Sequence, residues 1–280
     1  MTDTLEQIAC PHCDSDKYHL WAEEGGFAAV KCDDCGVVFV NPRPTEETIT
    51  EGHRIGMHRT ALGEGFSVRG RRHPLRIRHY KNIVREMFAT EIGDNQPLRW
   101  LDVGAGYGEF VEAVQAVLPA GSDVAGIEPM QPKMAVARQR GLPIDDRPLK
   151  AVPGQYDVVS MILVFSHIPD FRDFGAELKK RVKPGGILFM ETGNGGDLET
   201  RDEYPNKLFL PDHLIFAGID QMKQILATIG FQVEAIKRES IDNPLWCLKM
   251  FVKGVLERNL VVKVPYSSRF RTVFYKCRRV

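Results

Sequence analysis

Three glycines at alternate positions, Gly104, Gly106 and Gly108, follow closely on an acidic residue, Asp102. Glycine has no side chain to keep a ligand away from the backbone, and it tolerates positive φ angles. A second acid, Glu128, comes twenty residues after Gly108. An acid at that distance can accept hydrogen bonds from both ribose hydroxyls of a bound nucleotide. These residue types at this spacing predict a nucleotide-binding site.

The residue at position 109 indicates which kind of nucleotide this site would hold. The dinucleotide pattern G-x-G-x-x-G needs a third glycine where this chain has Glu109. A negative side chain at a helix start suits the helix dipole, but it repels a pyrophosphate bound there. The sequence therefore favours a ligand with ribose, adenine and a cationic end that carries no phosphate. S-adenosylmethionine has this make-up.

The residues around the glycines have the pattern of a strand, a tight turn and a helix. An apolar run ends at Asp102, and Phe110, Val111 and Val114 recur with helical spacing beyond the turn. A second short apolar run, 124–127, ends at Glu128. From there strand-like and helix-like segments alternate, which predicts an α/β fold with a doubly wound, mostly parallel sheet covered on both faces.

Four segments in this order resemble the successive motifs of class I S-adenosylmethionine-dependent methyltransferases. They are Asp102-Val-Gly104-Ala-Gly106-Tyr-Gly108, Gly126-Ile-Glu128-Pro129, Tyr156-Asp157-Val-Val-Ser160 and Val182-Lys-Pro184-Gly185-Gly186. The resemblance covers roughly residues 97–253, and it implies a seven-stranded Rossmann-like sheet. It also implies cofactor contacts from Asp102, Gly104, Ala105, Gly106, Tyr107, Gly108, Glu128 and Pro129. Asp146 lies where the family contacts adenine, although neighbouring backbone groups could serve equally well there.

Four cysteines are grouped in two pairs, Cys10 with Cys13 and Cys32 with Cys35. Two C-x2-C pairs at this separation are typical of a structural Zn²⁺ site, with short strands between them as in a zinc ribbon. Two disulfides are the competing interpretation, and a cytosolic chain disfavours them. Four thiolates would close the coordination shell, so the predicted zinc is structural rather than catalytic.

The segment from Cys32 to Pro44 resembles the N-terminal zinc-binding region of one methyltransferase subgroup. Members of that subgroup are associated with small-molecule, cell-surface sugar and natural-product pathways, so the resemblance implies a small-molecule methyl acceptor. In this subgroup a histidine after strand five lies near the acceptor pocket, and His213 matches it. Ala217 stands where the subgroup usually carries a hydroxyl residue.

Two histidines are candidates for the group that removes a proton from the acceptor. His167 follows a nearly unbroken apolar strand, 156–165, and ligands bind beyond the carboxyl ends of such strands. A histidine there can take a hydroxyl proton at neutral pH, or it can order the loop or stack near the cofactor. His213 is the second candidate. Oxygen is the expected acceptor atom, with carbon and nitrogen left open.

Basic residues gather in two stretches. Arg69, Arg71, Arg72, Arg76 and Arg78 form a cluster that predicts either a solvated surface or a site for an anionic substrate group. From Lys249 onward the chain carries nine Lys or Arg against one acid. That tail predicts either surface packing, through a strand or docking helix at 261–264 and 270–275, or an anionic partner. An RNA methyltransferase and a non-catalytic zinc-ribbon scaffold are therefore the alternative functions.

The chain as a whole has room for one large domain and a small appendage. Its 280 residues carry no formal net charge, which disfavours nucleic acid as the main partner. No apolar run approaches the length of a membrane span and no signal pattern is present, so we expect a cytoplasmic protein. The predicted organisation is a zinc ribbon at 1–44, a helical cap over the active site at 45–96, the methyltransferase core at 97–253 and a basic extension at 254–280. We expect the last two strands at 231–236 and 245–252.

Overall fold

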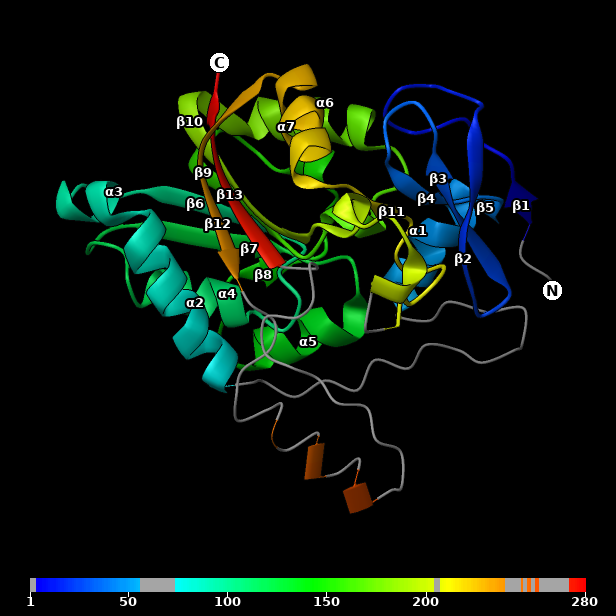
Figure 1. Ribbon diagram of the computed structural model, residues 1–280. Helices are drawn as coiled ribbons and strands as arrows, with labels where there is room; N and C mark the ends of the chain where they lie inside the picture. The colour runs from blue at the N-terminus through cyan, green and yellow to red at the C-terminus, as the bar shows by residue number, and fades with distance from the viewer. Residues whose placement is uncertain are drawn as a thin grey trace.

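The computed structural model describes residues 4–55, 74–203, 207–239 and 272–280, with short pieces at 248, 251–252 and 255–256. A seven-stranded sheet forms the centre of the molecule (Figure 1), and its strands lie in the order β12-β13-β10-β9-β6-β7-β8. The five strands from β10 to β8 are parallel, and β13 pairs antiparallel with β10 and with β12. The predicted doubly wound, mostly parallel α/β sheet is confirmed. The strands are β6 (Arg99–Val103), β7 (Asp123–Ile127), β8 (Ile144–Asp145), β9 (Tyr156–Ile162), β10 (Val182–Gly193), β12 (Phe231–Glu239) and β13 (Thr272–Arg279).

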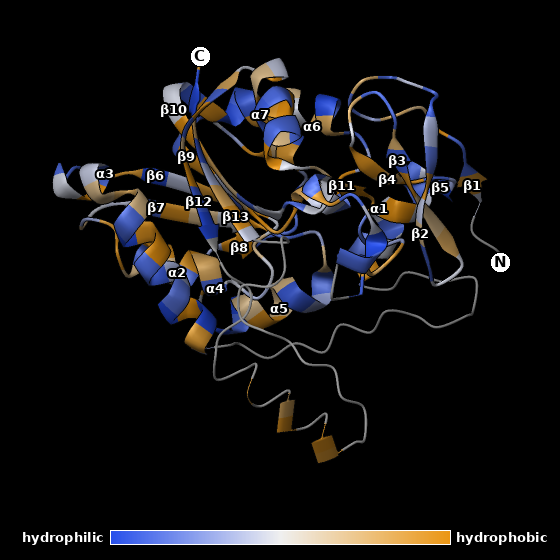
Figure 2. Ribbon diagram, viewed as in Figure 1, coloured by the Kyte–Doolittle hydropathy of each residue, from blue (hydrophilic) through white to orange (hydrophobic). Residues whose placement is uncertain are grey.

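Helices cover both faces of this sheet, because successive strand residues point to opposite sides. Along β9, Val158 packs with the cluster under α2 and α4, whereas Val159 packs with the cluster under α6 and α7. The helices themselves carry apolar and polar residues along their length, as Figure 2 shows. They are α1 (Glu46–Ile55), α2 (Pro74–Met87), α3 (Ala89–Gly93), α4 (Glu109–Gln115), α5 (Gln131–Gln139), α6 (Phe171–Arg181) and α7 (Ile219–Thr228). In the described segments, no helix combines the length and the apolar composition of a membrane span.

The last strand of the sheet is not where the sequence analysis predicts it. The expected strand at 245–252 falls mostly outside the described residues, and the position beside β10 is occupied by β13. Phe274 and Tyr275 on β13 are fully buried. The prediction of 245–252 was wrong. For 270–275 the sequence left a strand or a docking helix at the surface open, and the structure has a buried strand there. Part of the predicted C-terminal extension therefore supplies a strand of the core sheet.

The N-terminal region forms a second, smaller sheet in the order β11-β4-β3-β2. Its own strands are β2 (Tyr18–Glu24), β3 (Phe27–Cys32) and β4 (Val38–Val40), and a two-stranded ladder of β1 (Leu5–Glu6) and β5 (Arg43–Pro44) lies beside it. The fourth strand, β11 (Ile215–Phe216), comes from the core and pairs antiparallel with β4. The two parts of the molecule consequently share hydrogen bonds, and Figure 1 shows them side by side.

Candidate active site

The turn between β6 and α4 is built by its glycines, which all have positive φ. A Cβ at Gly104 would lie 2.4 Å from Val164 Cγ2, and one at Gly108 would lie 2.3 Å from Leu142 Cδ1, so these two glycines are required by packing. A Cβ at Gly106 would meet no atom within 4 Å. Gly106 therefore leaves open space in front of its own backbone, which is what a ligand lying on this turn needs.

Asp102 ends a chain of three buried polar side chains. Trp100 Nε1 donates to Ser160 Oγ at 2.8 Å, and Ser160 Oγ donates to Asp102 Oδ1 at 2.6 Å. Asp102 is only 1% exposed, and this burial raises its pKa to about 7 despite the hydrogen bond from Ser160. The nearby Glu128 carboxylate adds to the rise. A cation bound against Asp102 would favour its charged form.

Glu128 stands at the end of β7 with its carboxylate held by two backbone groups. Oε2 accepts from the N–H of Gly106 at 2.6 Å, and Oε1 accepts from the N–H of Met130 at 2.8 Å. A carboxylate oxygen has a second lone pair, so each oxygen can still accept a hydrogen bond from a ligand hydroxyl. These backbone contacts orient Glu128 toward the glycine turn.

One cavity of about 1660 Å³ joins these residues to the two histidines. Gly108 is not among its lining residues, because it faces Leu142. Asp146 lies at the cavity with its side chain half-exposed, 3.9 Å from Arg138 in an ion pair. The predicted site residues that line this cavity are Asp102, Gly104, Ala105, Gly106, Tyr107, Glu128, Pro129, Asp146, His167 and His213.

His167 and His213 lie next to each other, and both line this cavity. Their rings meet edge to face with centroids 4.8 Å apart. His167 Nδ1 lies 2.8 Å from the backbone oxygen of Asp212. Burial, and secondarily the neighbouring His167, lowers the pKa of His213 to about 4. His213 is therefore a neutral imidazole at pH 7, the form that can accept a proton.

Three further residues of this cavity were missed as site residues by the sequence analysis. His53 on α1 lies beside His167, with ring centroids 5.6 Å apart, and Asp212 lies 3.3 Å from His167 Nδ1 through its carboxylate. Tyr80 on α2 is buried and also lines the cavity. Only the residue types could have signalled His53 and Asp212, because their neighbours are distant in sequence.

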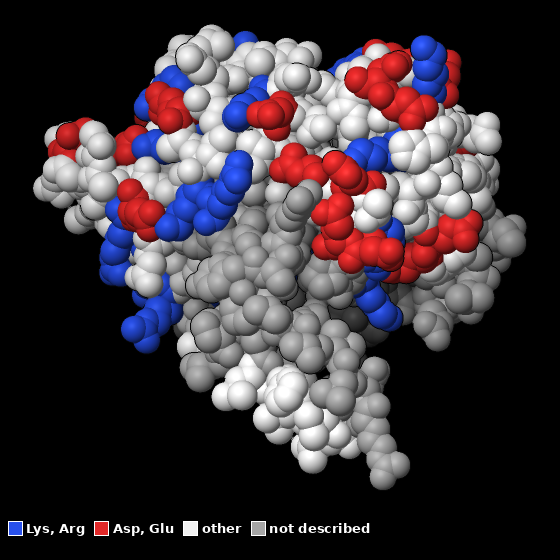
Figure 3. Space-filling model, viewed as in Figure 1, with Lys and Arg blue, Asp and Glu red and all other residues white. Residues whose placement is uncertain are grey.

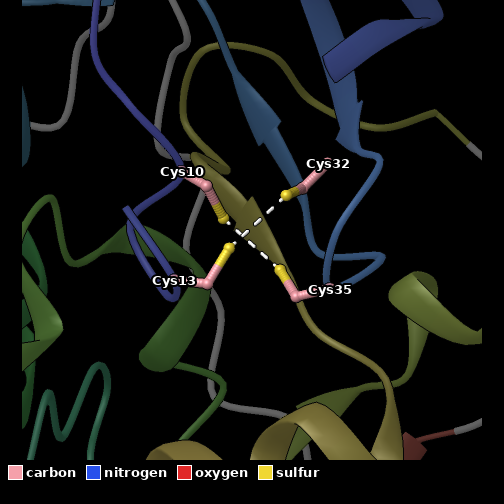
Figure 4. A group of neighbouring side chains, drawn as sticks. All are labelled: Cys10, Cys13, Cys32 and Cys35. Atoms are coloured by element: carbon pink, nitrogen blue, oxygen red, sulfur yellow. Dashed lines mark hydrogen bonds between the residues drawn. The ribbon is translucent and has the colours of Figure 1, made fainter. Parts of the chain in front are cut away.

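The four cysteines of the N-terminal region converge on one point (Figure 4). The sulfurs of Cys10 and Cys35 are 3.5 Å apart, as are those of Cys13 and Cys32, whereas a disulfide bond measures about 2.05 Å. Four thiolates around Zn²⁺ at about 2.3 Å would have sulfur separations of roughly 3.8 Å. The hydrogen bond between Cys10 and Cys35 lowers the pKa of the first thiol and raises that of the second, and thiolates are the form that binds a metal. The residues thus fit a tetrahedral metal ion.

A family model described as a methyltransferase domain matches residues 71–236. This match spans more than half of the chain. The chain belongs to the methyltransferase-domain family. The matched segment includes the glycine turn, Asp102, Glu128 and His167, whereas His53 and Thr272 of the same cavity lie outside it.

Among curated relatives, the chain is 35% identical over 127 residues to a ubiquinone biosynthesis O-methyltransferase of Bordetella avium, and the match covers 41% of this chain and 52% of that protein. The chain spans about half the length of the curated relatives it matches.

Solved structures with the same fold include geranyl diphosphate C-methyltransferase from Streptomyces coelicolor, which was crystallised with Mg²⁺, geranyl-S-thiolodiphosphate and S-adenosyl-L-homocysteine. The two chains are 15% identical with a TM-score of 0.52, and the match covers 71% of this chain and 76% of that chain. They also include the [4+2]-cyclase SpnF (TM-score 0.51, 16% identity, 72% and 80%). Such distant likeness shows the fold, and the chemistry has to be argued from the site.

Proposed function

We propose that the protein transfers a methyl group from S-adenosylmethionine to a hydroxyl oxygen of a small-molecule acceptor. The observation that carries this proposal is the single cavity that joins Asp102 and Glu128 to His167 and His213. The first pair suits the cofactor and the second pair suits an acceptor whose proton must be removed. The family match and the O-methyltransferase relatives support the same reaction.

The cofactor would lie over the glycine turn. Glu128, held by backbone N–H groups, would accept from the ribose hydroxyls. Asp102 and the turn from Gly104 to Gly108, with Ala105 and Tyr107, would hold the methionine end. Pro129 and Asp146 line the part of the cavity beyond Glu128, where adenine would lie. The open space in front of Gly106 fits a ligand at this place.

The reaction is a direct displacement. A lone pair of the acceptor oxygen forms a bond to the methyl carbon, the carbon–sulfur bond breaks, and its electron pair stays on sulfur in S-adenosylhomocysteine. The hydroxyl proton passes to a histidine, with His167 and His213 as the candidates. Because the sulfonium is already activated, the main contribution of the protein is to align the acceptor oxygen, the methyl carbon and the sulfur. Such alignment can lower the activation free energy by at most about 7–11 kcal/mol.

The acceptor is proposed to be a sugar or natural-product-type molecule that can carry an anionic group. Arg76 on α2 and Lys133 on α5 both line the cavity, and a guanidinium binds carboxylate or phosphate in bidentate fashion. Of the predicted basic cluster, Arg69, Arg71 and Arg72 lie outside the described residues.

A structural Zn²⁺ held by Cys10, Cys13, Cys32 and Cys35 is the second part of the proposal. The convergence of the four sulfurs supports it. With four thiolates on the ion, no position is open for substrate, so the metal would stabilise the ribbon and take no part in methyl transfer.

Calorimetry with S-adenosylhomocysteine tests the cofactor site without knowledge of the acceptor. We expect the unmodified protein to bind S-adenosylhomocysteine. In Glu128→Ala the affinity should fall roughly 10- to 100-fold, since hydrogen bonds to a charged group contribute about 1.5–3 kcal/mol each. No binding by the unmodified protein would instead support a non-catalytic scaffold.

Transfer of a labelled methyl group to a library of hydroxylated small molecules tests the second half of the site. In His213→Gln the rate should fall by about 10²–10⁴, the usual contribution of a general base, with S-adenosylhomocysteine affinity unchanged. Equal rates in the two proteins would contradict the role of His213. Labelling of RNA alone would favour the RNA methyltransferase.

A further inference from the structure

Two histidines and an aspartate from three separate elements meet at the acceptor end of the cavity. His53 lies on α1, His167 ends the short 3-10 turn after β9, and Asp212 precedes β11. One potential ligand atom from each lies within 4.8 Å of the others. All three residues line the cavity, and none of them belongs to the set assigned above to the cofactor.

The three side chains of this group already face one another. His167 Nδ1 lies 2.8 Å from the backbone oxygen of Asp212 and 3.3 Å from its carboxylate. The ring of His53 lies edge to face with that of His167, with centroids 5.6 Å apart. The potential ligand atoms of the three residues are therefore neighbours before any ion binds.

The separations are close to those of a filled site. Ligand atoms that share one ion at about 2.1 Å lie roughly 3–4 Å apart. In this structure the candidate ligand atoms of the three residues lie up to 4.8 Å apart. Binding of an ion therefore needs the side chains to move by about 1 Å, which rotation of an imidazole and of a carboxylate can supply. His167 and Asp212 are 26% and 18% exposed, so an ion can reach them from the cavity.

We propose that His53, His167 and Asp212 bind one divalent transition-metal ion, distinct from the zinc of the four cysteines. Two imidazole nitrogens and one carboxylate oxygen form a donor set that suits such ions and leaves coordination positions open. All three ligands line the cavity, so an acceptor bound in the cavity would lie beside the ion. A hydroxylated acceptor can therefore bind the ion directly through its oxygen.

The use of this ion in catalysis rests on the proposed methyl transfer. An acceptor hydroxyl bound to the ion has a lowered pKa and loses its proton more readily. His167 would serve as a ligand in this arrangement, which leaves His213, with its ring centroid 4.8 Å from that of His167, as the remaining histidine beside the ion. The ion thus assigns different roles to the two histidines and selects acceptors that present an oxygen ligand.

Titration with Co²⁺ of protein already loaded with zinc tests the ion site by itself. Thiolates hold Zn²⁺ in preference to Co²⁺, so cobalt added in this order reports nitrogen and oxygen ligands. We expect one Co²⁺ per chain, with visible absorption and without the near-ultraviolet thiolate bands of a cobalt-substituted ribbon. In His53→Ala and in Asp212→Asn the affinity should fall at least about 100-fold, since even loss of a ligand's hydrogen-bond partner costs roughly 10–100-fold.

His19→Asn is the matched control, because His19 is an exposed histidine that pairs with Asp33 far from the cavity. It should bind Co²⁺ like the unmodified protein. The zinc content of every variant, expected to stay at one per chain, verifies that the ribbon is intact. No Co²⁺ binding by the unmodified protein, or equal binding by the His53 and Asp212 variants, would overturn the proposal.

S-adenosylhomocysteine binding by the same variants separates this proposal from the proposed function. Asp212→Asn should bind S-adenosylhomocysteine normally. A protein that binds Co²⁺ but no S-adenosylhomocysteine would retain the ion site and refute methyl transfer. A protein that binds S-adenosylhomocysteine but no Co²⁺ would refute the ion site and leave the proposed methyl transfer in place.

Discussion

Asp102 carries its carboxyl group where almost no water reaches it, and burial brings its pKa to about 7. A group with this pKa is half protonated at neutral pH when the site is empty. If Asp102 holds the cationic methionine end of the cofactor, binding favours the carboxylate and must release the proton. The buried acid therefore couples cofactor binding to pH, with stronger binding above pH 7 than below it.

Proton release can be measured directly by calorimetry of S-adenosylhomocysteine binding in buffers with different ionisation enthalpies. At pH 7 the unmodified protein should release about half a proton per bound ligand, because the pKa of Asp102 is about 7 before the ligand binds. Asp102→Asn, which keeps the shape of the side chain, should release none. Identical proton release in the two proteins would show that another group titrates.

The glycines of the turn should respond differently to the same substitution. Gly106→Ala adds a methyl group to open space at a positive φ, so it should cost only about 1–2 kcal/mol of stability and weaken S-adenosylhomocysteine binding. Gly104→Ala also forces Cβ against Val164, which adds about 1–3 kcal/mol of overpacking. Thermal unfolding and ligand titration distinguish the two effects.

Gly93→Ala is the control for both variants, because Gly93 at the end of α3 has open space and no positive φ. It should change neither stability nor ligand affinity by much. A Gly106→Ala protein that binds S-adenosylhomocysteine with full affinity would show that the ligand does not lie on this turn.

At the scale of elements, β11 connects the N-terminal ribbon, residues 4–44, to the part of the cavity that is lined by His167 and His213. Asp212 and His213 directly precede this strand, whose residues Ile215 and Phe216 pair with β4 of the ribbon. Leu214 joins both parts, since its N–H donates to the Ser166 oxygen at 2.7 Å and its oxygen accepts from the Val40 N–H at 2.9 Å. The ribbon thereby holds the segment that carries His213 in place.

The cysteine pairs should accordingly be needed for order in a segment far from them in sequence. In Cys32→Ser with Cys35→Ser we expect loss of zinc and faster amide hydrogen exchange at residues 214–216, because β4 is no longer anchored. Exchange on β6 and β7 should change little. Asp33→Asn, which keeps all four thiols, is the control.

Unchanged exchange at residues 214–216 in the zinc-free protein would mean that the core alone holds β11. The comparison is informative because the contact between Gln221 Nε2 and the Cys35 oxygen, at 3.0 Å, also links the second cysteine pair to α7.

At the scale of the whole molecule, the C-terminal residues close the sheet and account for part of the basic tail. Lys276 pairs with Glu91 at 2.7 Å, and Arg278 pairs with Glu234 at 2.7 Å. These charges are used within the fold. The ribbon does not resemble a phosphate-binding surface either, since residues 4–44 hold seven Asp or Glu against three Lys or Arg, and Figure 3 shows mainly acidic side chains over that part of the face in view.

The structural role of β13 can be tested with one buried and one exposed residue of the C-terminal region. Phe274 is fully buried between β12 and β10, so Phe274→Ala should lower the free energy of unfolding by about 3–5 kcal/mol. Leu248, in the segment first expected to be the strand, is 59% exposed, and Leu248→Ala should stay within about 0.5 kcal/mol. Denaturant unfolding measures both, and the opposite ranking would contradict the observed sheet order.

The local patterns of the sequence determined most of the sheet, the glycine turn with its two acids, and the two cysteine pairs. Each depends on residues that are neighbours along the chain or on one repeated strand–helix unit, where spacing alone sets geometry. His167 was predicted from its place after a recognisable strand, and His213 from the resemblance to a methyltransferase subgroup. Their proton-transfer roles stay predictions.

Only the tertiary structure decided which strand closes the sheet and which side chains meet at the acceptor end of the cavity. Strand pairing at the antiparallel edge joins residues far apart in the chain, and several apolar stretches of the tail could have filled that place equally well. His53, His167 and Asp212 likewise come from three elements with long intervening segments. No periodicity links such residues, because packing of the whole chain sets their distances.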